Sequence, residues 1–321
     1  MSQPSPPPED GPSGFTDGVR LAIGTLSVFP VRPGVVDRRA GGIAMAVAPL
    51  VGAVIGACGG MTLVISVGLG VTPLPASVLA VAAVALFTRG LHLDGLADLA
   101  DGLGSAKPAE RALEIMKRSD IGPFGVVTLI LVLLVQVAAL QEAVTYAGAG
   151  AGAIILVAAC TAGRLALTWA CRRGIPPARP DGLGTMVAGT VRRSVAVIVT
   201  ALMLVGTTAL VYLHGIGAFS PWTSGSPSGS SGEFGYFAYM DTTYMETGDL
   251  TGITDVIPVT GLGPFLAPWG LPLAMLVGLL AAWAVRRRAV RRLGGVTGDV
   301  LGALVEIATA TTLLACTILT N

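Results

Sequence analysis

Charged residues are scarce in this chain of 321 residues, because Asp, Glu, Lys and Arg together make up only 12 % of it. Soluble globular proteins carry about a quarter of charged residues. This scarcity argues against an ordinary soluble enzyme, a disordered protein and a nucleic-acid-binding protein. Twenty Lys and Arg residues nearly balance nineteen Asp and Glu residues, so the net charge of +1 indicates no class of partner.

The chain also lacks paired cysteines. Its four cysteines lie in or next to apolar stretches, and none belongs to a CxxC motif: Cys58, Cys160, Cys171 and Cys316. Isolated cysteines in such surroundings behave as small apolar residues. We therefore expect neither a zinc site nor a redox site from them.

The N-terminal region is not expected to be a signal peptide. Residues 1–14 are rich in Pro and Ser, which predicts a disordered tail, and they lack the basic start and apolar run of a signal peptide. Residues 15–30 are apolar but contain Asp17 and Arg20. This pattern predicts a helix that lies on the membrane surface.

Long apolar runs dominate the rest of the chain, which is 53 % hydrophobic with a mean hydropathy of +0.76. A membrane-spanning helix needs about 20 apolar residues. We therefore predict an all-α polytopic membrane domain over residues 15–321. Seven spans are expected, at 41–70, 72–93, 122–145, 149–171, 194–213, 268–285 and 300–320.

The basic residues predict the orientation of these spans. Lys and Arg cluster in four segments that fall on one side if the spans alternate: 32–39, 107–118, 172–193 and 286–292. The connections on the other side contain no Lys or Arg: 71–75, 146–148 and 214–267. Cytoplasmic loops are enriched in basic residues. We therefore expect a cytoplasmic N-terminus, an outer C-terminus and a long external loop at 214–267 in a cell-membrane protein.

Three aspartates mark a candidate metal site on the basic side. Asp94, Asp98 and Asp101 are spaced i, i+4, i+7, so they fall on one stripe of a helix. Carboxylates this close repel one another unless a cation lies between them, and their hard oxygens suit Mg²⁺. The alternative is a solvated acidic helix end, although the neighbouring residues are apolar. His92 is either a general base or a structural histidine.

A second acidic pair lies near the C-terminus. Asp299 and Glu306 are seven residues apart on one face of the last span, and we count both as candidate metal ligands. Glu306 lies about 10 Å deeper than Asp299, at a depth similar to that of Arg164. Charges within a membrane are costly. Arg164 and Glu306 are therefore predicted to share a polar cavity open to the cytoplasm, or else to form a structural ion pair.

Basic and glycine-rich loops complete the candidate site. A pyrophosphate with Mg²⁺ needs the metal on one side and cationic side chains on the other. Lys117 and Arg118 follow a short amphipathic segment and could supply that charge, or could serve only to set the topology. Gly182 and Gly184 form a turn whose backbone could approach phosphate closely.

Together these segments resemble the cobalamin synthases, also called adenosylcobinamide-GDP ribazoletransferases. The resemblance runs in the family's order over about residues 20–310. It rests on HLDGLADLADG, LEIMKRSDIGPFG, the Gly-Arg at 163–164, DGLG at 181–184 and LGGVTGDVLGALVE.

The resemblance implies an integral membrane enzyme of late vitamin B12 synthesis. Such an enzyme joins adenosylcobinamide-GDP to α-ribazole or its 5′-phosphate, releases GMP and uses Mg²⁺. It implies that the aspartate stripe holds Mg²⁺ on the pyrophosphate and that one carboxylate or His92 takes the hydroxyl proton. Lys117, Arg118 and Arg164 would then neutralise the leaving group. The partners are these substrates and the lipid bilayer, with no nucleic acid, and a homo-oligomer is left open.

The chain departs from the family pattern at several positions. Arg118-Ser119-Asp120 stands where many relatives have Asp-Ser-Arg, and Pro123-Phe124 replaces a Thr-His pair. Thr309 replaces a second carboxylate that often follows the one matching Glu306. A catalytic role for the missing histidine is therefore excluded.

Two other functions share part of this pattern. CDP-alcohol phosphotransferases also place spaced aspartates at a membrane surface, but their first Asp-Gly is followed by Ala-Arg, whereas Asp101-Gly102 is followed by Leu-Gly-Ser. A secondary transporter would show internal repeats and acidic residues near mid-membrane. The sequence has no visible repeat, and most of its acidic residues outside the 214–267 loop lie at the inner surface.

Overall fold

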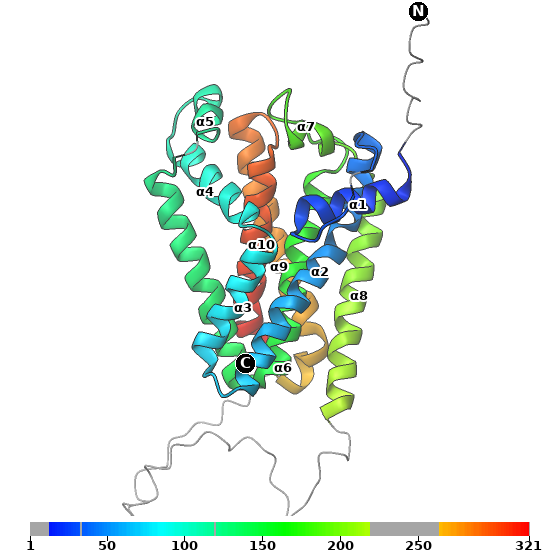
Figure 1. Ribbon diagram of the computed structural model, residues 1–321, viewed down its shortest axis with the longest axis vertical. Helices are drawn as coiled ribbons and strands as arrows, with labels where there is room; N and C mark the ends of the chain where they lie inside the picture. Colours follow the sequence, from blue (N-terminus) through cyan, green and yellow to red (C-terminus); the bar gives the residue numbers. More distant parts are fainter. Residues whose placement is uncertain (1–12, 33, 119, 219–262, 321) are drawn as a thin grey trace, which may run out of the picture.

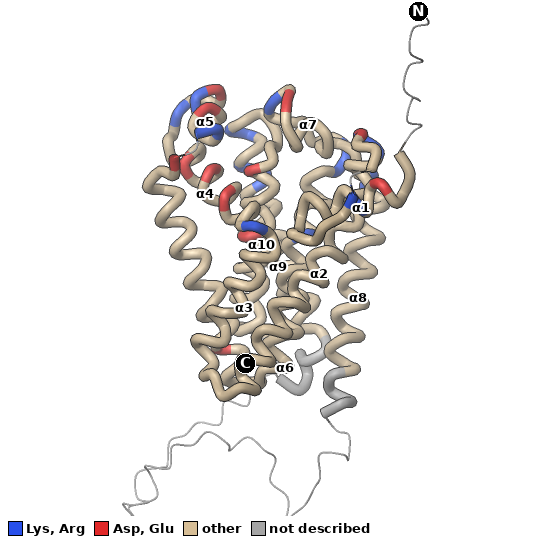
Figure 2. The backbone as a smooth tube through the Cα atoms, in the orientation of Figure 1, with Lys and Arg blue, Asp and Glu red and all other residues tan. Residues whose placement is uncertain are grey.

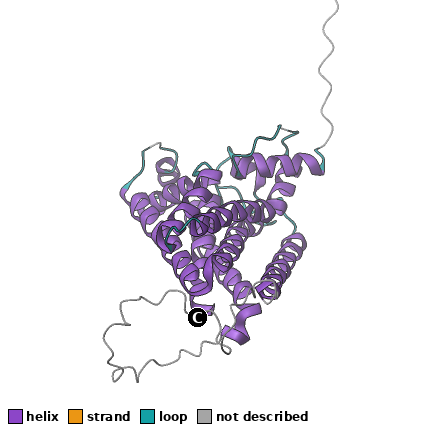
Figure 3. Ribbon diagram, turned by 60° about the horizontal axis from the view of Figure 1, so that its bottom comes forward, coloured by secondary structure: helices purple, strands orange, loops and turns teal. Residues whose placement is uncertain are grey.

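The computed structural model describes residues 13–32, 34–118, 120–218 and 263–320. Over these residues the regular structure is entirely helical, which confirms the all-α prediction (Figure 1, Figure 3). The helices are α1 (Phe15–Leu26), α2 (Arg38–Gly68), α3 (Pro73–Phe87), α4 (Leu91–Gly104), α5 (Ala109–Ile115), α6 (Pro123–Ala170), α7 (Leu183–Val187), α8 (Arg193–Ala218), α9 (Gly263–Leu293) and α10 (Gly298–Thr320).

Five of these helices, α2, α6, α8, α9 and α10, are long and apolar enough to cross a membrane. A sixth span is present if α3 and α4 are counted as one broken span, since they are bent by 89°. The expectation of one continuous span over 72–93 is therefore wrong. Arg89 and Gly90 adopt left-handed backbone conformations, with φ of 55° and 67°, and they end α3 and redirect the chain.

Helix α6 is folded back on itself. Its 48 residues would extend about 70 Å, more than twice the thickness of a bilayer core. Gly148, with φ 83° and ψ 167°, interrupts the helical conformation. The two ends of α6 both contact α4, and Figure 1 shows its halves running in opposite directions. The halves correspond to the predicted spans 122–145 and 149–171.

If α6 is counted as two spans and α3 with α4 as one, the described residues contain seven candidate spans, the number expected from the sequence. Residues 1–12 of the predicted tail and 219–262 of the predicted external loop lie outside the described residues. The domain limits and the orientation in the membrane stay predictions. The basic segment 286–292 does not lie in a loop, because α9 continues through it as helix.

Charged residues gather at one end of the bundle, which we call the charged end; it carries α4, α5 and α7 (Figure 2). Helix α1 lies across α2 near this end (Figure 1). Asp37 caps α2 by accepting a hydrogen bond from the Ala40 N–H at 2.7 Å. This bond and a second from Ser13 lower the pKa of the Asp37 carboxyl below its ordinary value.

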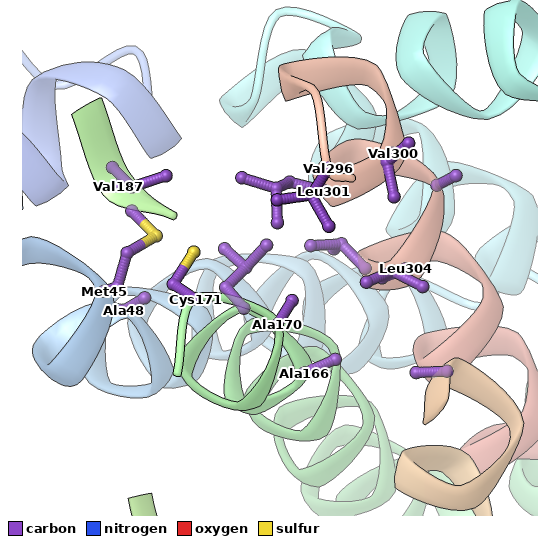
Figure 4. Close-up of a cluster of buried hydrophobic side chains, with 14 of the residues drawn as sticks. Met45, Ala48, Ala166, Ala170, Cys171, Val187, Val296, Val300, Leu301 and Leu304 are labelled. Atoms are coloured by element: carbon purple, nitrogen blue, oxygen red, sulfur yellow. The ribbon is translucent and has the colours of Figure 1, made fainter. Parts of the chain in front are cut away.

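The core forms where α2, the second half of α6 and α10 meet. A Cβ at Gly52 would lie 2.4 Å from the Cys160 carbonyl oxygen, so only glycine allows α2 and α6 to pack this closely. Met45 of α2, Ala166 of α6 and Leu301 of α10 meet there (Figure 4). Three of the four cysteines, Cys160, Cys171 and Cys316, are buried, which is typical of small apolar residues in a core.

Candidate active site

A cavity of about 290 Å³ opens at the charged end, above the core. Met45 and Leu301 belong to the core (Figure 4). Both also line the cavity. Five residues singled out from the sequence line the cavity: His92, Asp94, Gly182, Gly184 and Asp299. The structure thus brings together three segments that lie far apart in the chain.

Close packing of α4 on the start of α10 places the carboxylates. Gly95 follows Asp94, and a Cβ there would lie 2.8 Å from the Asp299 carbonyl oxygen. Because glycine lacks this atom, α4 approaches the Asp299 backbone directly and both aspartates line one cavity. Asp98, one turn further along α4, is half-buried and close enough to Asp94 and Asp299 to be repelled by both. A cation would relieve this repulsion.

Asp101 does not line this cavity. Its carboxylate accepts hydrogen bonds from the backbone N–H groups of Gly122, at 2.7 Å, and Gly125, at 2.9 Å. Both oxygens therefore cap the first turn of α6, where unpaired N–H groups favour negative charge. The glycines leave room for it, since a Cβ on either would lie 2.5 Å from a carboxylate oxygen. The metal role expected of Asp101 stays a prediction, and its contacts point to capping.

Arg179 is the cavity residue that the sequence analysis missed. Its guanidinium lies 3.8 Å from an Asp299 carboxylate oxygen and donates a hydrogen bond to the Leu113 carbonyl at 2.8 Å. It therefore connects α5 to the start of α10 while facing the cavity. The signal for it in the sequence is its position two residues before the Asp-Gly-Leu-Gly turn, within the basic segment 172–193 that predicts the orientation in the membrane.

The glycine-rich turn forms the wall facing α4. Gly182 has φ 83°, a left-handed conformation that favours glycine. A Cβ at Gly184 would lie 2.6 Å from the Val296 carbonyl oxygen, so this position also requires glycine. Arg38 of α2 holds the following residues by donating hydrogen bonds to the Thr185 and Ala188 carbonyls.

The two basic residues expected beside the aspartates lie outside the cavity. Lys117 forms a salt bridge of 3.3 Å with Asp181, and both side chains are more than half exposed. Such exposed pairs contribute little to stability. Arg118 lies near Asp101 and Asp120 in a separate surface pocket.

Arg164 and Glu306 are both buried, but neither lines the cavity. Arg164 Nη2 lies 3.4 Å from His92 Nδ1, whereas Glu306 accepts a hydrogen bond of 2.8 Å from Gln136. The three salt bridges among the described residues do not include an Arg164–Glu306 pair. The direct ion pair considered from the sequence is therefore not formed. The two charges remain close enough to interact electrostatically.

The oxygen donors around the cavity suit Mg²⁺ only if water and substrate phosphates supply the remaining ligands. Within the described part of the chain, no three His, Cys, Asp or Glu side chains lie close enough to hold a metal on their own. Magnesium sites usually use one or two carboxylates, several waters and the phosphates of a substrate. Asp94 and Asp299, with Asp98 beside them, fit that pattern. Glu306 does not line this cavity and accepts a hydrogen bond from Gln136, so the metal role expected of it stays a prediction.

Comparison with known proteins shows the family to which the chain belongs. The chain is 39 % identical to the adenosylcobinamide-GDP ribazoletransferase of Frankia casuarinae over 305 residues, which cover 92 % of each chain. It is 33 % identical to the enzyme of that name from a Nocardioides species, over 93 % of this chain and 97 % of the relative. No solved structure matches. The model of the cobalamin-5-phosphate synthase family matches residues 18–317, a range that includes every residue of the cavity, and the chain belongs to this family.

Proposed function

We propose that this chain transfers the adenosylcobinamide phosphate group from adenosylcobinamide-GDP to α-ribazole or α-ribazole 5′-phosphate and releases GMP. The family match and the names of the relatives support this reaction. The structural observation that carries the proposal is the cavity in which Asp94 and Asp299 face Arg179 and a glycine-rich turn. Carboxylates and an arginine around one cavity suit a pyrophosphate bound together with a divalent cation.

Mg²⁺ is the cation that these oxygen donors favour, and Asp94, Asp98 and Asp299 would hold it. When bound, it would offset the negative charge of the pyrophosphate. Arg179 is anchored by Asp299 and by the Leu113 carbonyl, so its guanidinium is held in place to bind a phosphate oxygen. The backbone of Gly182 borders open space, so a phosphate can approach it closely, whereas Gly184 lets the turn pack against Val296.

The reaction is an in-line displacement. A ribose hydroxyl of α-ribazole, or of its 5′-phosphate with that phosphate left unchanged, attacks the phosphorus attached to cobinamide and gives up its proton. The bond between that phosphorus and the bridging oxygen breaks, and GMP leaves with the bridging oxygen. The residues of the cavity orient the two phosphates for this attack.

A carboxylate is better suited than His92 to accept the proton of the attacking hydroxyl. Arg164 can only donate hydrogen bonds, so His92 Nδ1, 3.4 Å away, must be the acceptor in any bond between them. The proton of a neutral His92 then resides on Nε2, which has no partner among the described residues. His92 Nε2 would therefore already carry a proton and could not accept one, and Asp94 or Asp98 would act as the base.

The test is release of GMP by the purified protein supplied with adenosylcobinamide-GDP, Mg²⁺ and either acceptor. The faster acceptor identifies the substrate. Asp94→Asn is expected to reduce the rate by about 100-fold or more, because the variant loses a charge at the reacting phosphates. Glu110→Gln, an exposed carboxylate change on α5, serves as the matched control and should keep full activity. Equal rates for Asp94→Asn and the unmodified protein would contradict the proposed site.

A further inference from the structure

A second cavity, of about 580 Å³, lies between the second half of α6, α8 and α9. None of the candidate site residues lines it. Its walls include Trp169 and Trp283, and Trp169 is fixed by a hydrogen bond of 2.9 Å from its Nε1 to the Thr200 hydroxyl. The cavity is therefore separate from the proposed catalytic site and has walls of its own.

Three arginines line this cavity: Arg172, Arg193 and Arg286. The Arg286 side chain is buried although it is charged, with 6 % exposed. Arg172 Nε is buried without a hydrogen-bond partner, and the Arg172 and Arg286 guanidinium groups are close enough to repel each other. None of the salt bridges in the described part of the chain involves these arginines. Buried cations are normally paired, so this site has the charge to bind an anion.

The remainder of the cavity is apolar and reaches the outer surface of the bundle. Leu276, Leu279 and Leu280 line it on the α9 side, and Leu280 is 63 % exposed. On the other side, α8 is packed loosely, because only 11 % of its most apolar stretch is buried inside the bundle. An alkyl chain entering between α8 and α9 would therefore contact leucine and tryptophan side chains throughout.

The arginines lie at the level where a lipid headgroup is expected. Arg172 lies two residues after the end of α6 and Arg193 begins α8, so both mark the charged end of these helices. Arg286 lies seven residues before the end of α9, a distance of about 10 Å. The cationic part of the cavity therefore faces the membrane interface, and the apolar part extends toward the bilayer core.

We propose that this cavity binds an anionic phospholipid, with its phosphate on Arg172 and Arg286 and an acyl chain along the leucines of α9. The charge complementarity and the lateral apolar opening both favour a ligand that is anionic at one end and apolar at the other. The proposal does not depend on the reaction assigned above. Free phosphate, or the phosphate of a substrate, would share only the anionic half of this chemistry.

The experiment measures binding by the full chain purified in a neutral detergent. Thermal stability is followed as dioleoyl phosphatidylglycerol, dioleoyl phosphatidylcholine, glycerol 1-phosphate or adenosylcobinamide-GDP is added. We expect phosphatidylglycerol to raise the melting temperature at a concentration about tenfold lower than phosphatidylcholine does. The double variant Arg172→Gln/Arg286→Gln should lose this preference, because each guanidinium supplies charge-assisted hydrogen bonds. Arg288→Gln, an exposed change on the same helix, should keep it.

Several results would overturn the proposal. Equal shifts with the two lipids would remove the headgroup selectivity, and an equal shift with glycerol 1-phosphate would show a simple anion site. A shift with adenosylcobinamide-GDP that disappears in the double variant would assign the cavity to substrate. Native mass spectrometry of the unmodified protein provides a measurement that does not require the variants to fold. It should detect retained phosphatidylglycerol in preference to phosphatidylcholine from a 1:1 mixture, and no preference would contradict the site.

Discussion

Asp101 differs from the other aspartates of its helix in what its carboxylate contacts. Asp94 is exposed in the cavity and Asp98 is half-buried beside it, whereas Asp101 is buried and accepts two backbone hydrogen bonds at the start of α6. Spacing alone made the three residues equivalent, because it describes only their positions around one helix. The difference depends on Gly122 and Gly125, more than twenty residues away in the chain.

Replacement of Asp101 by Asn should therefore destabilise the protein without changing its response to magnesium. An amide can accept through one oxygen only, which leaves a buried N–H group unpaired at a cost of about 1–3 kcal/mol. Thermal unfolding in detergent measures this loss, and the Mg²⁺ concentration for half-maximal GMP release measures the metal site. Asp98→Asn is the comparison variant, with a raised Mg²⁺ requirement and a smaller loss of stability. A raised Mg²⁺ requirement in Asp101→Asn would restore Asp101 to the metal site.

At the scale of the helices, short breaks decide where the functional side chains lie. Arg89 and Gly90 turn α4 away from α3, and Gly148 reverses the direction of α6. Because of these breaks, α4 contacts both ends of α6 and the start of α10. Hydropathy predicted two separate spans for α6, and the break at Gly148 falls between them. It also extended the predicted span 72–93 into α4, since Leu91 and Leu93 are as apolar as the residues before them.

Gly148→Ala should test the break in α6. A conformation with φ 83° and ψ 167° is essentially confined to glycine, so an alanine there should cost about 1–3 kcal/mol. A Cβ at Gly148 would meet nothing within 4 Å, so the loss would arise from the backbone alone. Thermal unfolding measures it. Gly206→Ala in α8, also in open space but in a regular helix, should leave stability unchanged or slightly raised. An unchanged melting temperature in Gly148→Ala would show that the helix does not break there.

At the scale of the whole molecule, charged residues are concentrated at one end of the helical bundle. Nearly all charged residues of the described part gather at the end that carries α4, α5 and α7 (Figure 2). The basic segments in the sequence predicted this one-sided distribution. The proposed catalytic cavity lies at the charged end. Because basic residues are retained in the cytoplasm, we propose that the cavity opens to that side.

Labelling of single cysteines in intact cells should test this orientation. In a background without the four native cysteines, Ser105→Cys, beside α4, should be protected from an impermeant thiol reagent added outside. Ser226→Cys, within the predicted external loop, should react. Permeabilising the cells should make Ser105→Cys reactive and serves as the control for accessibility. Reaction at Ser105→Cys alone in intact cells would contradict the predicted orientation and indicate the opposite one.

The sequence by itself determined the helical class, the approximate spans, the one-sided charge and the motifs of the family, because hydropathy, periodicity and spacing are local properties of the chain. Only the tertiary structure decided that Asp94 meets Asp299, that Arg179 faces them and that Asp101 caps α6. These contacts join segments tens to hundreds of residues apart. They depend on helices approaching closely at positions such as Gly95 and Gly184, where the absence of a Cβ admits a neighbouring carbonyl. A glycine in the sequence shows that such an approach is allowed, but the partner that makes it is selected by the packing of the whole bundle.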